Sequence, residues 1–150
     1  MVVQSAGVCP NSELPDGLTG AGERPLAGLS ERQFLALFAR RPGMYVGRAT
    51  WFRVVAWLEG YDMHGDRYTG GVLDGFREWL LTRPGARGPN LVWSAIVWGL
   101  AFPGRESPGP AELTDDEDRH ALAVLFELVD AFLAEQESRS RCGREASDVP

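Results

Sequence analysis

Residues 91–102 constrain the fold of this chain more than any other segment, because nearly all of their side chains are apolar. Asn90 stands immediately before them and can cap a helix. Periodicity alone does not separate a buried helix from a buried strand in such a run. Its length is more typical of a helix, and no other segment offers a partner strand. We therefore predict an all-α fold, a compact bundle of about five helices with 51–60 and 91–102 at its centre.

Two helices are predicted in the first half of the bundle. Ser30 and Gln33 form a capping-box pattern, in which each side chain accepts a hydrogen bond from the other residue's backbone N–H, and a helix follows over 30–40. Thr50 can cap a second helix over 51–60, where a glycine ends it. This second helix is apolar on every side, which is typical of a helix in the core.

Two more helices are predicted around the central pair. Thr69 can cap a helix over 70–82, whose apolar residues follow helical spacing. Gly75 costs that helix about 1 kcal/mol relative to alanine, so we expect it to permit the close approach of a neighbouring helix. The last helix begins at Thr114 and runs to about residue 137. Its acidic first turn suits the positive end of the helix dipole.

The chain of 150 residues suits one domain, since 44% of its residues are hydrophobic and can form a core. We assign the helical domain to 28–138. The flanking segments 1–27 and 139–150 lack hydrophobic periodicity and are predicted to be disordered tails. Cys9 and Cys142 lie in these tails as incidental thiols, and whether they ever pair stays open.

Nothing in the sequence predicts a membrane segment. No run reaches the roughly 18 apolar residues of a membrane span. The N-terminus has neither the basic region nor the long apolar region of a signal peptide. We expect a cytoplasmic protein that does not contact a membrane.

Charge is divided unevenly along the chain, whose net charge is −6. Residues 28–105 carry ten arginines and six acidic residues, a net charge of +4, whereas 106–138 carry ten acidic residues and one arginine, a net charge of −9. A protein this acidic, with no concentrated basic stripe, is not expected to bind nucleic acid. The acidic end forms a solvated helix surface or meets a basic partner.

Residues 40–47, Arg-Arg-Pro-Gly-Met-Tyr-Val-Gly, are predicted to form a tight connector between two helices. Pro42 fixes its own φ, and Gly43 and Gly47 permit backbone angles that other residues resist. Two interpretations stay open. The connector packs its methionine and tyrosine on the core with the arginines in water, or it presents arginine and tyrosine side chains to a partner.

The Arg-Pro-Gly-Met-Tyr-Val-Gly segment, Gly60-Tyr61, Phe76-x-x-Trp79-Leu80 and Trp93 together resemble a group of small bacterial, actinobacterial-type proteins, mostly uncharacterised and some of them immunity-like. The resemblance covers roughly residues 30–100 and brings no catalytic residue with it. It implies a protein that binds a partner and occludes it.

The connector is also similar to the segment that opens the ATPase domain of the gyrase B family. A second segment, Phe126-Glu127-Leu128-Val129-Asp130-Ala131, is similar to the nucleotide-site helix of that family. The family has an asparagine there that helps to hold magnesium, and Ala131 stands in its place. We therefore do not expect ATPase activity.

These observations predict a non-catalytic protein-binding module, immunity-like or antitoxin-like, that needs no cofactor. The candidate binding residues are arginines and aromatic residues of the connector and the helix after it: Arg41, Tyr45, Arg48, Trp51, Trp57 and Tyr61. The interface is expected to combine this region with the loop predicted over 61–68, or to use the acidic segment 112–118 instead, against a basic toxin. A small apolar ligand is the other occupant that the aromatic residues would suit.

The sequence contains no nucleotide-binding, serine-hydrolase or zinc motif. Its strongest catalytic candidates are Asp62, His64 and Asp66, which alternate in the predicted loop and would point one way if the loop were extended. Such a group binds a metal or transfers protons, although an ordinary polar loop explains it as well, and we predict no metal. The alternative function is a small metal-free cyclase or isomerase of a bacterial biosynthetic pathway, with an aromatic pocket.

Overall fold

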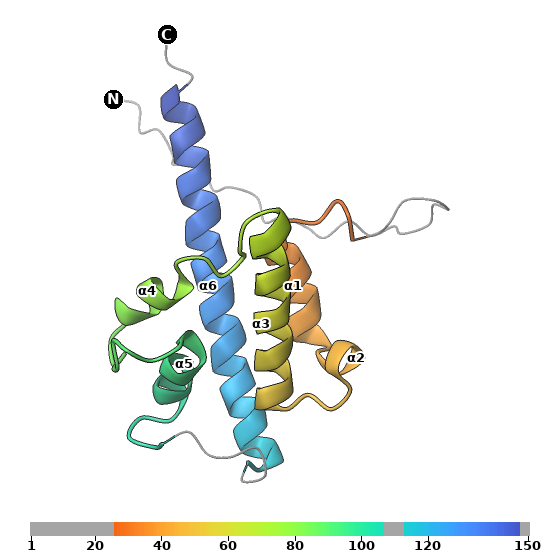
Figure 1. Cartoon of the computed structure of the whole chain (residues 1–150), viewed down its shortest axis with the longest axis vertical. Coiled ribbons are helices and arrows are strands. Elements are labelled where there is room, and N and C mark those ends of the chain that lie inside the picture. Colours follow the sequence, from red (N-terminus) through yellow and green to blue (C-terminus); the bar gives the residue numbers. More distant parts are fainter. Residues whose placement is uncertain (1–25, 107–112, 148–150) are drawn as a thin grey trace, which may run out of the picture.

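The computed structural model describes residues 26–106 and 113–147, and the regular structure in these ranges is entirely helical (Figure 1). The helices are α1 (Glu31–Arg40), α2 (Gly43–Val46), α3 (Trp51–Tyr68), α4 (Phe76–Leu81), α5 (Trp93–Ala101) and α6 (Asp115–Ser147). The predicted all-α fold is confirmed, and the apolar run 91–102 contains a helix. The tail predicted over 1–27 lies almost wholly outside the described residues. Within those residues, no helix combines the length and the apolar character that crossing a membrane requires.

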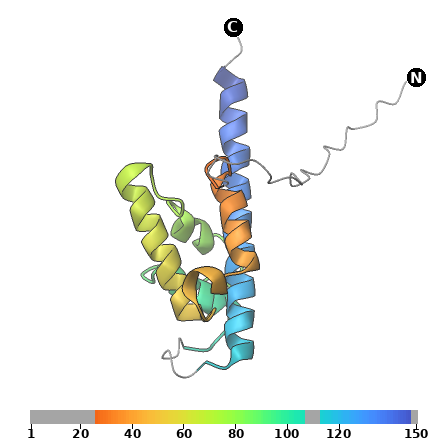
Figure 2. The same ribbon diagram turned by 90° about the vertical axis from the view of Figure 1, so that its right-hand side faces the viewer.

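The long helix α6 is the spine of the bundle, because α1, α3, α4 and α5 all pack against it. In Figure 1, α4 and α5 lie on one side of this helix and α1 and α2 on the other, and Figure 2 shows α1 running alongside it. Its buried stripe consists of Ala121, Leu122, Leu125, Val129, Phe132 and Leu133. The segments predicted to be central, 51–60 and 91–102, do contribute to the core. The element that joins α1, α3, α4 and α5 is nevertheless the acidic, amphipathic last helix.

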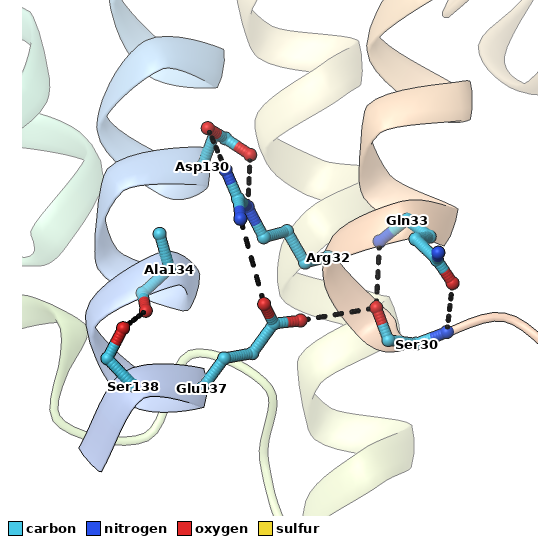
Figure 3. Close-up of polar contacts among 7 residues, drawn as sticks. All are labelled: Ser30, Arg32, Gln33, Asp130, Ala134, Glu137 and Ser138. Atoms are coloured by element: carbon cyan, nitrogen blue, oxygen red, sulfur yellow. Dashed lines mark hydrogen bonds and ion pairs between the residues drawn. The ribbon is translucent and has the colours of Figure 1, made fainter. Parts of the chain in front are cut away.

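A polar clamp fixes the start of α1 to α6 (Figure 3). Arg32 donates from Nε and Nη2 to the two carboxylate oxygens of Asp130 at 2.7 and 3.0 Å, which is a bidentate pair. Arg32 Nη1 lies 3.6 Å from Glu137 Oε2, and Ser30 Oγ donates to Glu137 Oε1 at 3.2 Å. Ser30 also forms the predicted capping box, because its N–H donates to Gln33 Oε1 at 2.9 Å and its Oγ accepts from Gln33 N at 3.2 Å. Residues near both ends of the described chain are thereby tied together.

Helix α3 continues to Tyr68, so the prediction that it ends at Gly60 is wrong. A glycine costs a helix only about 1 kcal/mol, which packing of the neighbouring turns outweighs. The helix ends instead at Tyr68, where the carbonyl oxygen of Gly65 accepts from the N–H groups of Thr69 and Gly70, each at 2.8 Å. A Cβ on Gly65 would lie 2.8 Å from the Gly70 oxygen, so this close turn requires a glycine.

Helix α4 occupies only the second half of the helix predicted over 70–82, because turns replace the first half. Gly75 is its N-cap, with a φ of 77° in the left-handed region. A Cβ on Gly75 would meet nothing within 4 Å, so its predicted role in close helix approach is wrong. In α5, the N-cap is Val92 without a side-chain bond, and Asn90 is not the cap that the sequence suggested.

Helix α6 starts with a capping box, as predicted. Thr114 Oγ1 accepts from Glu117 N at 3.3 Å, and Glu117 Oε2 accepts from Thr114 N at 2.8 Å. At its other end the helix continues to Ser147, so residues 139–147, predicted as part of a tail, lie within it. These last turns project beyond the other helices in both views (Figures 1 and 2). The thiol of Cys142 is exposed there, whereas Cys9 lies outside the described residues.

Candidate binding surface

The connector predicted over 40–47 folds as a single helical turn, α2, held between two special residues. Pro42 is the N-cap, and its carbonyl oxygen accepts from the N–H groups of Tyr45 and Val46 at 3.0 and 3.1 Å. Gly47 ends the turn with a φ of 75°, which is strained for any residue with a side chain. We call residues 40–48, together with Arg53, the α2 corner. Pro42 and Gly47, the residues from which the connector was predicted, thus fix the backbone at the two ends of the turn.

The α2 corner presents apolar side chains to solvent. Met44 is 75% exposed and Tyr45 is 40% exposed, and no residue of α2 is buried. The first of the two interpretations, in which the methionine and the tyrosine both pack on the core, is therefore wrong for Met44. Exposed large apolar side chains that lie together typically mark an interaction site.

A stack of aromatic rings supports Tyr45 from behind. Its ring centroid lies 5.1 Å from that of Phe38 and 5.7 Å from that of Trp57, both in edge-on geometry. Trp57 in turn stacks on Phe38 at 3.9 Å and on Tyr61 at 5.2 Å, and Phe34 stacks on Tyr61 at 5.4 Å. Rings packed in this way cannot rotate freely, so the exposed tyrosine is held in one orientation.

Tyr61 closes the stack and anchors it to α1. Its hydroxyl donates to Glu31 Oε2 at 2.6 Å. Partial burial, together with the hydrogen bond to the Glu31 carboxylate, raises the pKa of Tyr61 well above its usual range. The phenol is therefore a permanent donor, and its structural role is to hold the two helices together.

Trp51 does not belong to this surface, although the sequence analysis grouped it with the binding residues. It is only 3% exposed, and its ring lies 5.7 Å from that of Trp98 in the core. Helical geometry separates it from Trp57, because six positions along α3 turn the two side chains to different sides of the axis. The predicted binding residues are thus divided: five lie at or beside the α2 corner, and Trp51 is a core residue.

The arginines of the α2 corner differ in whether they have partners. Arg48 pairs with Asp115, and Arg53 Nη1 donates to the Val46 carbonyl oxygen at 3.3 Å. The guanidinium groups of Arg40 and Arg41 are exposed and have no polar partner among the residues that the structure describes. Between Phe34 and Leu58 the chain contains four arginines and no acidic residue, so the acidic residue that partly neutralises this corner, Asp115, comes from α6.

Next to the α2 corner lies a groove of about 500 Å³ between the connector and α6. We call it the α2–α6 groove. Its apolar lining consists of Ala39, Pro42, Ala49, Leu122, Ala123 and Phe126, and its charged lining consists of Arg48, Asp115, Asp118 and Arg119. No pattern in the sequence reveals this groove, because its walls come from segments that are more than sixty residues apart in the chain.

The acidic first turn of α6, the other candidate surface, is occupied by internal contacts. Asp115 pairs with Arg48, and Asp116 pairs with Arg119. Glu117 caps its own helix and also accepts from Arg105. The Thr114 backbone N–H and then the Arg105 guanidinium lower the pKa of Glu117 to about 2.

The fourth acid of that turn, Asp118, is 6% exposed and performs a task that the sequence does not reveal. Its Oδ1 accepts from the backbone N–H of Trp51 at 2.7 Å. Thr50 is the N-cap of α3 but makes no side-chain capping bond. A carboxylate from α6 therefore caps α3 across the bundle.

The candidate catalytic residues lie on α3, so the expectation of an extended loop is wrong. Asp62 and Asp66 are one helical turn apart, whereas His64 lies about 200° around the axis from each of them. Asp62 Oδ1 accepts from Leu73 N at 2.7 Å, and the His64 ring packs on Tyr68 at a centroid distance of 4.8 Å. The structure does not bring the three together, and no metal-binding group of three such side chains occurs within the described residues.

His64 instead lines an open groove of about 890 Å³, which we call the His64 groove. The same groove is lined by Tyr61 and Glu31, and by the apolar side chains of Leu26, Ala27, Leu29 and Phe34. The Tyr61 hydroxyl is tied to Glu31, whereas the His64 ring packs on Tyr68 and makes no hydrogen bond to the described residues. The groove suits an apolar ligand with one polar group better than it suits a metal.

No protein-family model, curated protein or solved structure matches this chain.

Proposed function

We propose that this protein is a non-catalytic protein-binding module that covers the working surface of a partner with its α2 corner, as an immunity protein occludes a toxin. One observation carries the proposal. Met44 and Tyr45 are exposed on a helical turn with no buried residue of its own, yet Tyr45 is held in place by a stack of aromatic rings. An exposed apolar group on a rigid support loses little conformational entropy when it is covered.

The composition of the α2 corner fits a binding hot spot. Tyrosine and arginine are enriched among the residues that carry binding energy, and methionine is enriched at interfaces. The corner brings all three types together on a connector whose conformation a proline and a glycine fix. By contrast, the acids that begin α6 are bonded within the chain, which favours the α2 corner over the acidic turn as the contact surface.

A second candidate function is the binding, and conversion, of a small apolar molecule in the His64 groove. The observation that favours it is the combination of apolar walls with the imidazole of His64 in one groove. Mass spectrometry of the intact protein, purified from its own host under native conditions, tests this candidate. A bound small molecule that disappears in the His64→Trp variant supports it, and a protein of the bare chain mass contradicts it.

The test of the protein-binding function is site-specific photocrosslinking in the native cell. A photoreactive phenylalanine analogue replaces Met44 in one variant and Met63 in the other. The two methionines are matched, since Met63 on α3 is 66% exposed and also contacts solvent. We expect one dominant protein adduct from position 44 and none from position 63. Equal labelling from both positions, or none from either, contradicts the proposal.

A further inference from the structure

We propose that the partner of the α2 corner is an acidic protein segment, in which an apolar side chain is flanked by carboxylates. The apolar side chain enters the α2–α6 groove, and the carboxylates bind the guanidinium groups of Arg41 and Arg48. This inference rests on the proposed function, because it specifies the chemistry of the partner at the same surface.

The α2 corner carries positively charged side chains, although the whole protein has a net negative charge. The chain carries a net charge of −6, but its 34–58 segment carries four positive charges and no negative one. Arg40 and Arg41 are exposed without a polar partner within the described residues. A guanidinium group presents a planar fork of donors that matches a carboxylate. A partner surface complementary to this corner is therefore acidic.

The α2–α6 groove explains why the partner also needs an apolar group. Its walls include Pro42 and Ala49 from the connector and Leu122 and Phe126 from α6. A volume of about 500 Å³ accommodates a large side chain together with part of the adjoining backbone. Arg48 lines the groove itself and Arg41 directly precedes the lining residue Pro42, so we assign the flanking carboxylates of the partner to these two side chains.

The ion pair between Arg48 and Asp115 lies in the charged lining of the groove, and a carboxylate of the partner can replace Asp115 in it. Both side chains are largely exposed, at 69% and 74%, so solvent screens their attraction and the pair contributes little to stability. A partner carboxylate takes the place of Asp115 on Arg48, while the exposed Asp115 carboxylate returns to water. Asp115 thus acts as an internal competitor of the partner.

A different polyanion, nucleic acid, fits this surface less well. Nucleic-acid binding depends on many phosphate contacts from a basic stripe, and this corner offers only four arginines, two of which have internal contacts. Nucleic acid also has no apolar side chain for the groove. We include a single-stranded oligonucleotide as a competing probe for this reason.

The experiment is a titration of short synthetic peptides into the full-length, isotope-labelled protein, followed by NMR. The first peptide has a central leucine and tryptophan flanked by aspartate and glutamate. The second has lysine in place of every acid, and the third keeps the acids but has serine in place of the apolar pair. We expect the first peptide to shift the signals of Ala49 and Leu122 and to bind at least about tenfold more tightly than either of the others. Added salt should weaken this binding.

Three variants locate the contacts. Arg41→Gln should lower the affinity for the first peptide by about fivefold or more, because one charge-assisted contact is lost. Arg87→Gln removes an arginine that is also exposed but lies on the loop before α5, and it should leave affinity unchanged. Asp115→Asn should tighten binding by about twofold to fivefold, since it removes the competitor of the partner carboxylate. Thermal melting confirms that each variant is folded.

The outcomes separate this inference from the proposed function. Equal binding of the acidic and the basic peptide, or tighter binding of the oligonucleotide, overturns the acidic partner. A crosslinked adduct at position 44 without any binding of the acidic peptide also overturns it and leaves the proposed function standing. If neither the adduct nor peptide binding is found, the proposed function fails and the inference fails with it.

Discussion

The α2 corner and the first turn of α6 are both highly charged, and the ion pair between Arg48 and Asp115 joins them, but they use their charges in opposite ways. Every acid in the first turn of α6 has a partner within the chain, and one of them is buried as a cap for another helix. In the α2 corner, the guanidinium groups of Arg40 and Arg41 have no polar partner within the described residues, and the nearby side chain of Met44 is exposed to solvent. A charged cluster is therefore assigned to folding or to binding by its partners, not by its composition.

The loss of stability is expected to be greatest at Asp118, the buried acid of the first turn of α6. The change Asp118→Ala should lower the free energy of unfolding by about 2 kcal/mol, because the buried N–H of Trp51 loses its acceptor. Urea denaturation measures this loss. The matched variant Asp118→Asn keeps an acceptor oxygen and should lose clearly less stability. If Asp118→Ala unfolds at the same urea concentration as the parent protein, the first turn of α6 does not have the structural role assigned to it.

The α2 corner should respond to charge reversal in the opposite manner. The double change Arg41→Glu and Arg48→Glu should weaken partner binding at least about tenfold, equivalent to about 1.4 kcal/mol, while the midpoint of thermal unfolding stays near that of the parent. Stability is retained because the one pair that is broken is exposed. Binding is measured against the partner recovered by crosslinking. An unchanged affinity would contradict the assignment of these arginines to the interface.

The hydrogen bonds of Glu117 predict how the stability of the protein depends on pH in acid. Its pKa of about 2 in the folded protein lies below the roughly 4.3 of an unperturbed glutamate. Its contribution to stability is therefore complete above about pH 4.3 and is lost as the pH falls through about 2. Thermal melts across that window should show a steeper loss of stability for the parent than for Glu117→Gln, which does not titrate. Parallel curves for the two proteins would mean that the carboxylate is not held by Thr114 and Arg105 in solution.

The smallest effect is expected at Asp116. Its pair with Arg119 is exposed on both sides, at 88% and 74%, so Asp116→Asn should change the free energy of unfolding by less than about 0.5 kcal/mol. The same urea denaturation measures it. A loss as large as that of Asp118→Ala would show that charge in this turn matters regardless of burial, which would remove the distinction between its four acids.

Patterns within a few consecutive residues predicted the starts of two helices and the conformation of the connector. The capping boxes at Ser30 and Thr114 were visible as patterns four residues long, and both are present with the expected hydrogen bonds. The apolar run 91–102 was long enough for its helix to be inferred from length. The connector was predicted from its proline and glycines, which act on their own backbone.

Two errors of prediction in α3 arose because the outcome depended on how the helix packs in the bundle. Gly60 does not end α3, since packing of the surrounding turns outweighs the cost of one glycine. Trp51 and Trp57 belong to the same aromatic helix, but only the direction in which α5 and α6 approach decides that the first is core and the second lies beside the surface.

The sequence by itself determined the helical class, both capping boxes and the rigid connector, because these features rest on contacts within a few residues. The tertiary structure alone decided which charges are free. Asp115 and Asp118 are both aspartates and lie three residues apart. Asp118 is buried and accepts from the backbone N–H of Trp51, whereas Asp115 is exposed and pairs with Arg48. Their different roles follow from how α6 packs against α3 and the connector. Burial and partnering of a charge depend on which elements meet in space, and that is a property of the whole fold.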